Sequence, residues 1–489
     1  MIILIVIFSI LSILISILIY RRINYFKNLN VPHETLNILF GNTQKSTLGK
    51  CSVAYDADRV YTKFKGRGLC AGFMNGFTPY LLPLKAEVLK QILITNFKNF
   101  RNNSFGFETE RHSVISLNPF WLRNEQWKQK RSELSPALTS SRLKGMYPLI
   151  DDAAKQFTDY INIKMSSNTS IVFDVRDISL RYSCNSITST TYAFNAKAYD
   201  DENTSEILNY GRKMWKSISS STQLPSSPIT REVNQYFIRI TNQAVQRRRY
   251  NNEKRNDLLN YVISLKDKRN FSEIETAAHA MTFFLDGFET SSLALCYVLY
   301  ELSKNTRVQE KLRIEINESI DKNQTVPIET LLNLTYLDQV FYEAIRLHPP
   351  LYYTTRQCNE SIELISDEQK ILISNGTTIW IPIYSIHRDP DIYENPHEFM
   401  PERFDEENGG VKAFRDKRVL IPFGESARIC LGKKLGTLQI KAAVVELLRN
   451  FELICDESVT DDDLEIRPKR FANIPKGEIK VQFKKLSEF

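Results

Sequence analysis

The chain has 489 residues, of which 42% are hydrophobic and 25% are charged. This balance can bury a core and argues against a mainly disordered, collagen-like or low-complexity protein. Its seven cysteines are far apart and form no CxxC pair or Cys/His cluster, which argues against a disulfide scaffold and a zinc finger. The net charge of +7 is mild, and no lysine/arginine tract indicates a nucleic-acid-binding surface.

Residues 2–20 are uncharged and consist mostly of Ile, Leu, Val and Phe. A helix of this length spans roughly 28 Å, about one bilayer core. Arg21, Arg22 and Lys27 follow at once, so the positive-inside rule places the rest of the chain in the cytosol. We therefore expect a transmembrane signal-anchor over residues 1–20. A cleaved signal peptide is the alternative, but no positive region precedes the apolar stretch and no small-residue cleavage site follows it.

After the anchor, residues 21–45 are expected to form a polar linker and residues 46–489 a single folded domain. Helical patterns dominate from about residue 85 to residue 350. Short β-type runs occur near 51–83, 353–383 and 470–484. The expected body is mainly helical with a minor β portion.

The longest predicted helix begins near Ser272, where Ser272 and Glu275 fit a capping box, and ends near Asn305. It is almost entirely apolar over residues 277–300, so a second transmembrane span is an alternative. The polar exceptions share one helical face and are His279, Thr282, Asp286, Glu289 and Thr290. A lipid-facing helix would not carry such a stripe. We expect a helix buried in protein, with the stripe lining a cavity.

The most specific segment is residues 422–432, where a lone cysteine, Cys430, follows Pro/Gly-rich turns and precedes a predicted helix over 433–450. A helix N-terminus and the nearby Arg428 both favour an anionic sulfur that could hold a metal. A buried structural cysteine is the alternative interpretation.

This segment resembles the haem loop of the cytochrome P450 family, Phe-x-x-Gly-x-Arg-x-Cys-x-Gly. The chain supplies Phe423, Arg428, Cys430 and Gly432, with Ser426 in place of the first glycine. Other family motifs follow in the expected order: Trp127-x-x-x-Arg131, Gly287-x-Glu289-Thr290, Glu343-x-x-Arg346, Arg356 ten residues later, and Pro401-Glu402-Arg403-Phe404. The resemblance covers nearly the whole chain. Details such as Phe288-Glu-Thr-Ser-Ser292 are most similar to the insect microsomal branch that handles foreign compounds and lipophilic metabolites.

The resemblance implies the cytochrome P450 fold, an α-rich single globular domain with small β-sheets behind an N-terminal transmembrane helix. It implies a haem-thiolate monooxygenase that inserts one atom of dioxygen into a lipophilic small molecule, a xenobiotic or an endogenous lipid or hormone. The cofactor would be thiolate-ligated haem b. Electrons would come from NADPH through a cytochrome P450 reductase, with cytochrome b5 as a further candidate partner. The protein would lie in the endoplasmic reticulum membrane with the catalytic domain in the cytosol.

The resemblance also assigns roles. Cys430 would be the axial iron ligand, whose electron density favours O–O cleavage. The other haem contacts would be Trp127, Arg131, Arg356, Phe423, Arg428 and Gly432. Glu343, Arg346 and Arg403 would form a structural triad, and His387 is interpreted as a structural histidine rather than an iron ligand. The candidate substrate contacts, which are aromatic or aliphatic as a lipophilic substrate requires, would be Phe105, Phe107, Phe284, Tyr352, Tyr353 and Ile474.

Three residues of the long helix would be catalytic. Glu289 and Thr290 would supply the two protons that the reaction consumes, although the Thr290 hydroxyl could instead bond only to its own helix. Asp286 stands where most of the family has alanine or glycine. It could be a buried acid with a raised pKa that relays protons or orients the substrate, a structural hydrogen-bonding group, or a covalent haem attachment.

Two features concern partners and rival functions. Lys128, Lys130, Lys433 and Lys434 suggest a basic docking face for an acidic flavoprotein.

A haem-thiolate isomerase or dehydratase that needs no reductase is one rival function, and the Glu289–Thr290 pair argues against it. A non-catalytic haem or ligand carrier is the other rival, which the departures at Ser426 and Asp286 keep open.

Overall fold

A computed structural model gives the structure of the chain and describes residues 2–104, 113–203, 205–221, 231–321, 324–460 and 464–486, with the backbone alone at 219–221. The described residues form two compact units. Unit 1 combines residues 1–104 with 353–386, and unit 2 combines residues 105–352 with 387–489. A strand near residue 80 pairs with one near residue 380, which joins the two segments of unit 1. The single domain expected over 46–489 stays a prediction.

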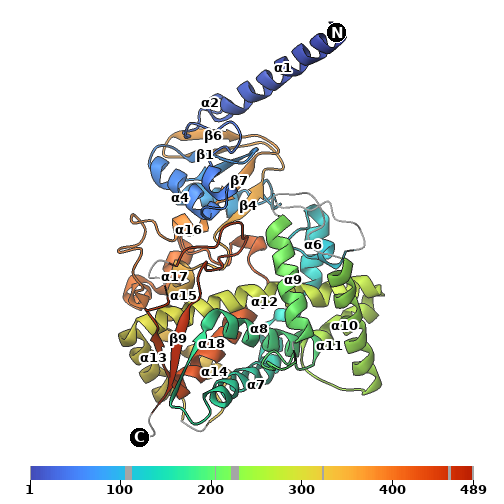
Figure 1. Ribbon diagram of the computed structural model, residues 1–489, viewed down its shortest axis with the longest axis vertical. Coiled ribbons are helices and arrows are strands. Elements are labelled where there is room, and N and C mark those ends of the chain that lie inside the picture. Colours follow the sequence, from blue (N-terminus) through green and yellow to red (C-terminus); the bar gives the residue numbers. More distant parts are fainter. Residues whose placement is uncertain are drawn as a thin grey trace. The chain divides into compact units, whose positions relative to one another are not determined.

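Unit 1 is a small α/β unit that carries the N-terminal helix (Figure 1). Its helical elements are α1 (Ile2–Ile23), α2 (Tyr25–Asn28), α3 (Gln44–Thr47), α4 (Val53–Phe64), α5 (Ala86–Lys90), the π-helical turn η1 (Gln91–Thr95) and α16 (Ile383–Ile386). Its main sheet has the order β1-β2-β7-β4, from β1 (Cys70–Asn75), β2 (Thr78–Pro83), β7 (Thr378–Ile381) and β4 (Thr354–Gln357). Strands β5 (Ile362–Ser366) and β6 (Gln369–Ile373) form a separate hairpin.

Helix α1 buries none of its residues and is the one helix in the described part of the chain that is long and apolar enough to cross a membrane. It ends at Ile23, three residues beyond the expected anchor. At its base, the Arg22 guanidinium donates a hydrogen bond to the carbonyl of Gly76 (2.6 Å) and lies 4.0 Å from the centre of the Phe77 ring.

The segment expected to be a linker is part of unit 1. Phe26 is fully buried against Gly72, where a Cβ would lie 2.4 Å from the Phe26 ring. The Gly72 amide donates to the carbonyl of Pro32 (2.8 Å), and the Asn42 amide donates to the carbonyl of Met74 (2.8 Å). The few apolar side chains of this mostly polar segment, led by Phe26, thus dock on strand β1, and the linker assignment of residues 21–45 stays a prediction.

Unit 2 is mostly helical. Its α-helices are α6 (Asn124–Leu134), α7 (Ser140–Met165), α8 (Val175–Tyr192), α9 (Glu206–Ser221), α10 (Arg231–Tyr250), α11 (Leu258–Arg269), α12 (Glu273–Lys304), α13 (Thr306–Ser319), α14 (Ile328–Asn333), α15 (Thr335–Leu347), α17 (Gly410–Asp416) and α18 (Lys433–Asn450). The 3-10 turns are η2 (Val114–Leu117), η3 (Ser135–Leu138), η4 (Pro401–Phe404), η5 (Glu406–Asn408) and η6 (Ser426–Arg428). Strands β3 (Ser170–Asp174), β9 (Lys480–Lys485) and β8 (Phe451–Cys455) form an antiparallel sheet in that order.

Helix α12 is the core of unit 2 (Figure 1, yellow). The predicted capping box between Ser272 and Glu275 is present, with both reciprocal hydrogen bonds. The helix packs against α8, α10, α11, α15 and α18, and most of its residues are buried. It is therefore a protein-core helix, as its polar stripe indicated, and the mainly helical fold with small sheets is confirmed.

We expect Phe26→Ala to destabilise unit 1 by about 3–5 kcal/mol, because it leaves a cavity over Gly72. Thermal unfolding of the purified full chain in detergent measures the effect. Leu39→Ala, which truncates a side chain that is 63% exposed in the same segment, is the matched control and should leave the transition unchanged. An unchanged transition for Phe26→Ala would support the linker interpretation.

Candidate active site

The candidate site is built around the loop that precedes α18. The Cys430 amide donates to the carbonyl of Phe423 (2.8 Å), which closes the loop, and Gly432 is the N-cap of α18. The backbone has positive φ at Gly424 (+69°) and at Ser426 (+63°). Ser426 therefore adopts the left-handed conformation that favours the glycine of the family motif. The Cys430 side chain is accessible to solvent.

Opposing effects act on the Cys430 thiol. Desolvation by the surrounding protein, although the side chain is accessible, and the charge of Asp286 raise its pKa to about 11, whereas the Gly432 amide, Arg131 and Lys433 act in the opposite direction. Desolvation thus raises the pKa of Cys430 by more than the helix N-terminus and the nearby cations lower it. A metal cation bound to the sulfur would deprotonate it outright.

Arg131 on α6 and Lys433 on α18 are the two cations whose charges lower the pKa of Cys430. Burial lowers the pKa of the Arg131 guanidinium, while the charges of Cys430 and Asp286 raise it. Among the described residues, the Arg131 side chain makes no hydrogen bond or ion pair. A half-buried guanidinium without a protein partner is suited to a ligand carboxylate.

Arg428 and Trp127 form a second cationic element. The Arg428 guanidinium lies 4.2 Å from the centre of the Trp127 ring and donates to the carbonyls of Pro119 and Leu122, both at 2.9 Å. Trp127 is buried. The sequence motif thus places Trp127 and Arg428 together in space, although part of the donor capacity of Arg428 is used by the protein backbone.

Arg356 lies on β4 of unit 1 and is buried. Its Nη1 donates to Asn103 Oδ1 (2.7 Å) and to the carbonyl of Thr355 (2.8 Å), whereas its Nε has no partner among the described residues. Burial lowers the pKa of Arg356 to about 10. The unpartnered Nε–H is a donor available to an anionic group.

These residues fit haem. An accessible cysteine sulfur can serve as an axial ligand, and Arg131 in the same unit has unused donors for a carboxylate group. The Phe423, Arg428 and Gly432 positions lie in the Cys430 loop, as expected from the motif.

Asp286 on α12 is accessible at the same side of unit 2 as Arg131 and Cys430, since their charges influence one another. Burial raises the pKa of its carboxyl group to about 7, whereas a hydrogen bond from Asn118 and the charge of Arg131 lower it. Asn118 Nδ2 donates to Asp286 Oδ1 at 3.1 Å. The side chain is accessible, and the surrounding protein still desolvates its carboxyl group enough to raise the pKa. The interpretation of Asp286 as a proton-relaying acid stays a prediction.

The side chains of Thr290 and Glu289 have different partners on different faces of α12. The Thr290 hydroxyl donates to the carbonyl of Asp286 (2.5 Å), which is the intrahelical bond considered as an alternative. Glu289 is buried and accepts from Arg176 Nη2 (2.5 Å), while Arg176 Nη1 donates to Ser292 (2.8 Å). Burial lowers the pKa of Arg176, but the Glu289 carboxylate raises it above its usual value.

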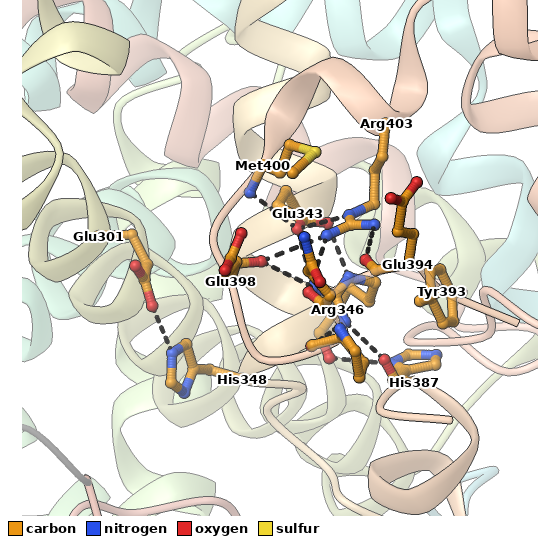
Figure 2. A network of polar contacts seen from close by, with 12 residues as sticks. Glu301, Glu343, Arg346, His348, His387, Tyr393, Glu394, Glu398, Met400 and Arg403 are labelled. Carbon is orange, nitrogen blue, oxygen red and sulfur yellow. Dashed lines mark hydrogen bonds and ion pairs between the residues drawn. The ribbon is translucent and has the colours of Figure 1, made fainter. Parts of the chain in front are cut away.

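The triad expected from the family motifs is present and fully buried (Figure 2). Glu343 accepts two hydrogen bonds from Arg346, at 2.7 and 2.8 Å, and one from Arg403 Nε at 2.8 Å. The Met400 amide donates to the same carboxylate (3.1 Å). Both guanidinium groups also donate to backbone carbonyls of the segment 394–398. The carboxylate therefore holds helix α15 and turn η4 together.

His387 extends this network to the cysteine loop, and its placement confirms a structural role. Its Nε2 accepts from the Ile421 amide (3.0 Å), so Nδ1 carries the proton and donates to the carbonyl of Arg346 (3.2 Å). Burial, together with the charge of Arg346, lowers the pKa of His387 to about 3. Both ring nitrogens are used, and the imidazole stays neutral.

Most of the expected substrate contacts are buried or lie outside the described residues. Phe105 and Phe107 lie outside the described residues. Phe284 is fully buried and stacks on Phe288, with ring centroids 5.2 Å apart. Tyr352 is buried, and its hydroxyl donates to the carbonyl of Arg470. Tyr353 is buried in unit 1 and stacks on Trp380, with ring centroids 3.7 Å apart. Each of these three side chains has a packing or hydrogen-bonding partner within the protein, and their role as substrate contacts stays a prediction. Ile474 is partly accessible.

The proposed basic face also needs correction. Lys130 is buried, and its Nζ lies 3.0 Å from the Glu133 carboxylate. Burial lowers the pKa of Lys433 to about 8. Lys128 and Lys434 are exposed, and Lys434 donates to Ser140 (2.9 Å). Lys130 was misassigned because its side chain turns toward α12.

The structure adds two residues that the motifs did not indicate. Asn118 follows η2 and contacts Asp286, and Arg176 on α8 pairs with Glu289. Both are isolated polar residues far in sequence from α12. Only the packing of η2 and α8 against α12 brings them to the site.

Comparisons with known proteins agree with this geometry. The family profile described as Cytochrome P450 matches residues 57–483. The chain is 30% identical to "Probable cytochrome P450 28a5" of Drosophila melanogaster over 95% of both chains. It is also 30% identical to "Cytochrome P450 6A1" of Musca domestica, over 93% of this chain and 92% of the relative. A third relative, "Cytochrome P450 6a9" of Drosophila melanogaster, is 31% identical over 90% of both chains.

We expect Ser426→Gly to retain haem as well as the unchanged protein or better, because glycine adopts a φ of +63° without the strain of about 1–2 kcal/mol that a serine carries. The haem content per chain and the rate of haem transfer to apomyoglobin measure retention. Ser426→Ala, which keeps a Cβ and removes the hydroxyl, is the control. Loss of haem in both variants would show that the serine hydroxyl makes a specific contact.

We expect the free energy of unfolding of the unchanged protein to fall, relative to that of Asp286→Asn, as the pH rises from 5 to 8. The folded-state pKa of Asp286, about 7, lies above its ordinary value of 3.8. The neutral acid thus stabilises the fold at low pH, and this contribution is lost as the pH rises through 7. Thermal unfolding of the haem-loaded proteins measures it. Asp267→Asn, an exposed carboxylate elsewhere in unit 2, is the control; a pH-independent difference at Asp286 would contradict the shift.

Proposed function

Because the chain belongs to the cytochrome P450 family, we propose that it is a membrane-anchored monooxygenase of the endoplasmic reticulum that acts on a lipophilic small molecule. At the level of the family, the protein is an oxidoreductase of the cytochrome P450 monooxygenase class and binds thiolate-ligated haem b. The observation that carries the proposal is the accessible Cys430, in a closed loop, with Arg131 and Asp286 facing it.

Haem, when bound, supplies the iron that activates dioxygen with two electrons. The chain's own residues do the rest. Cys430 would hold the iron as a thiolate, while Arg131 and Arg428 would bind carboxylate groups of the cofactor through their donors. The Trp127 ring keeps the Arg428 guanidinium in place by a cation–π contact. The resemblance to the family implies Arg356 of unit 1 as a further haem contact, and its Nε–H, which has no partner among the described residues, is a donor suited to an anionic group.

The residues that would deliver protons lie on the accessible face of α12. Asp286 combines accessibility with a pKa near 7, which suits an acid that gives up and regains a proton at neutral pH. The Thr290 hydroxyl lies one turn away and must release the Asp286 carbonyl in order to donate its proton elsewhere. Glu289, bonded to Arg176, contributes by fixing α12 against α8. The relay we propose thus runs through Asp286 and Thr290.

The partners follow from the same proposal. NADPH–cytochrome P450 reductase would deliver electrons, with cytochrome b5 as a second donor, and the exposed Lys128 and Lys434 are candidates for contact with an acidic flavoprotein. Helix α1, which is apolar and buries none of its residues, would anchor the chain, with Arg21 and Arg22 on the cytosolic side. A role in the metabolism of foreign compounds or endogenous lipids is what the resemblance of Phe288-Glu-Thr-Ser-Ser292 to the insect microsomal branch implies.

We expect the full chain, reconstituted with the reductase, to consume NADPH and to add one oxygen atom to a substrate found by screening a library with mass spectrometry. The ferrous–carbonyl complex should show the absorption band of thiolate-ligated haem. Cys430→Ala should abolish the band and the turnover, because it removes the ligand sulfur. Cys455→Ala, a half-buried cysteine on β8, is the matched control and should keep both.

Each rival function has its own outcome in this assay. A reductase-free isomerase or dehydratase would convert a substrate without NADPH. A haem or ligand carrier would show the thiolate band without turnover of any substrate. A band that survives Cys430→Ala would overturn the ligand assignment itself.

A further inference from the structure

Asp286 is the accessible carboxyl group on the catalytic face of α12, and its orientation is fixed by Asn118. The Phe120 amide donates to Asn118 Oδ1 (2.8 Å), so the Asn118 amide group must present its Nδ2 to Asp286. Asn118 is fully buried, which holds this arrangement in place. Asp286 Oδ1 is consequently a permanent acceptor, and Oδ2 has no partner among the residues that the structure describes.

Two other acidic groups at α12 have counter-ions, whereas no ion pair to Asp286 is found among the described residues. Glu289 is paired with Arg176 at 2.5 Å, and Glu133 is paired with Lys130 at 3.0 Å. Arg131 influences Asp286 electrostatically but forms no ion pair with it in the described structure. In the proposed function, the Arg131 guanidinium is committed to a carboxylate of the cofactor. The ionised Asp286 is then a negative charge without a neighbouring cation.

An uncompensated carboxylate that is largely enclosed by protein is costly. It can be neutralised by a proton or by a cation that enters with a ligand. Because Oδ2 is unpartnered and the side chain is accessible, a ligand can reach it directly. A protonated amine has both the positive charge and the N–H donors that the free oxygen lacks, and a charge-assisted hydrogen bond is about twice as strong as a neutral one.

We propose that this protein prefers lipophilic substrates that carry a basic amine, and that Asp286 binds the ammonium group through Oδ2 while Asn118 holds Oδ1. The inference rests on the proposed function, since it concerns the substrate of that same site. It makes Asp286 a specificity-determining residue, and it makes Asn118 a positioning residue that acts through Asp286. A neutral alcohol would bind more weakly there, because it brings no charge to offset that of the carboxylate.

The test uses the haem-loaded full chain in detergent and a matched pair of probes, a hindered N-methylpiperidine with an aryl substituent and its carbocyclic isostere. Hindrance at nitrogen prevents direct coordination to iron, which the absorption spectrum verifies. Equilibrium dialysis and the spectral shift of the ferric protein give the two dissociation constants. We expect the unchanged protein to bind the amine about 10-fold more tightly than the isostere, as one charge-assisted contact implies.

Asp286→Asn keeps the size and the Oδ1 acceptor but removes the charge, so it should abolish the preference while leaving the affinity for the isostere unchanged. Asn118→Ala should reduce the preference without abolishing it, since the carboxylate remains but loses its fixed orientation. Asp267→Asn, which removes one exposed charge elsewhere in unit 2, is the control and should keep the preference.

Equal affinities for amine and isostere in the unchanged protein would overturn the proposal, and so would a preference that survives Asp286→Asn. If Asp286→Asn does not load haem, Asp286→Ser replaces it; if neither loads, the affinities of the unchanged protein and of Asn118→Ala decide. The thiolate band and NADPH-dependent turnover are recorded on the same preparations. Their presence without an amine preference would refute this inference alone, whereas their absence would refute the proposed function.

Discussion

The buried carboxylate of Glu343 is the constraint on which unit 2 depends. It accepts hydrogen bonds from Arg346 and Arg403, and these two guanidinium groups tie helix α15 to the carbonyls of a segment that has little regular structure of its own (Figure 2). Through the carbonyl of His387, the network continues to Ile421, two residues before the cysteine loop. Removing one partner would leave charge buried without compensation, which is far more costly than losing an exposed ion pair.

Helix α12 divides its polar residues between two tasks. Glu289 faces α8 and is neutralised by Arg176, so it stabilises packing. Asp286 faces Arg131 and Cys430, remains accessible, and has a raised pKa. The two acids are three residues apart, yet one has a cation within hydrogen-bonding distance and the other has only an amide. The same helix thus contributes an inert ion pair and a group able to exchange a proton or bind a cation.

Motifs with fixed local spacing predicted their partners well, because the geometry of one helix or loop decides them. The Glu343–Arg346 pair is one turn apart on α15, and the positive φ at Ser426 follows from the loop pattern. Composition was a poorer guide. The burial of Phe26 shows that a polar segment can dock on a sheet, and the burial of Lys130 shows that a charged helix position can face inward when Glu133 neutralises it.

The sequence by itself determined the helical class, the apolar N-terminal helix, the family and the members of the buried triad, and it predicted Cys430 as the iron ligand, because each of these depends on local order and spacing. Only the tertiary structure decided which long-range partner each polar group has. Asn118 meets Asp286 across 168 residues, and Arg176 meets Glu289 across 113. The physical reason is that a side chain's charge state depends on its solvation and neighbours, which are set by packing between elements distant in the chain.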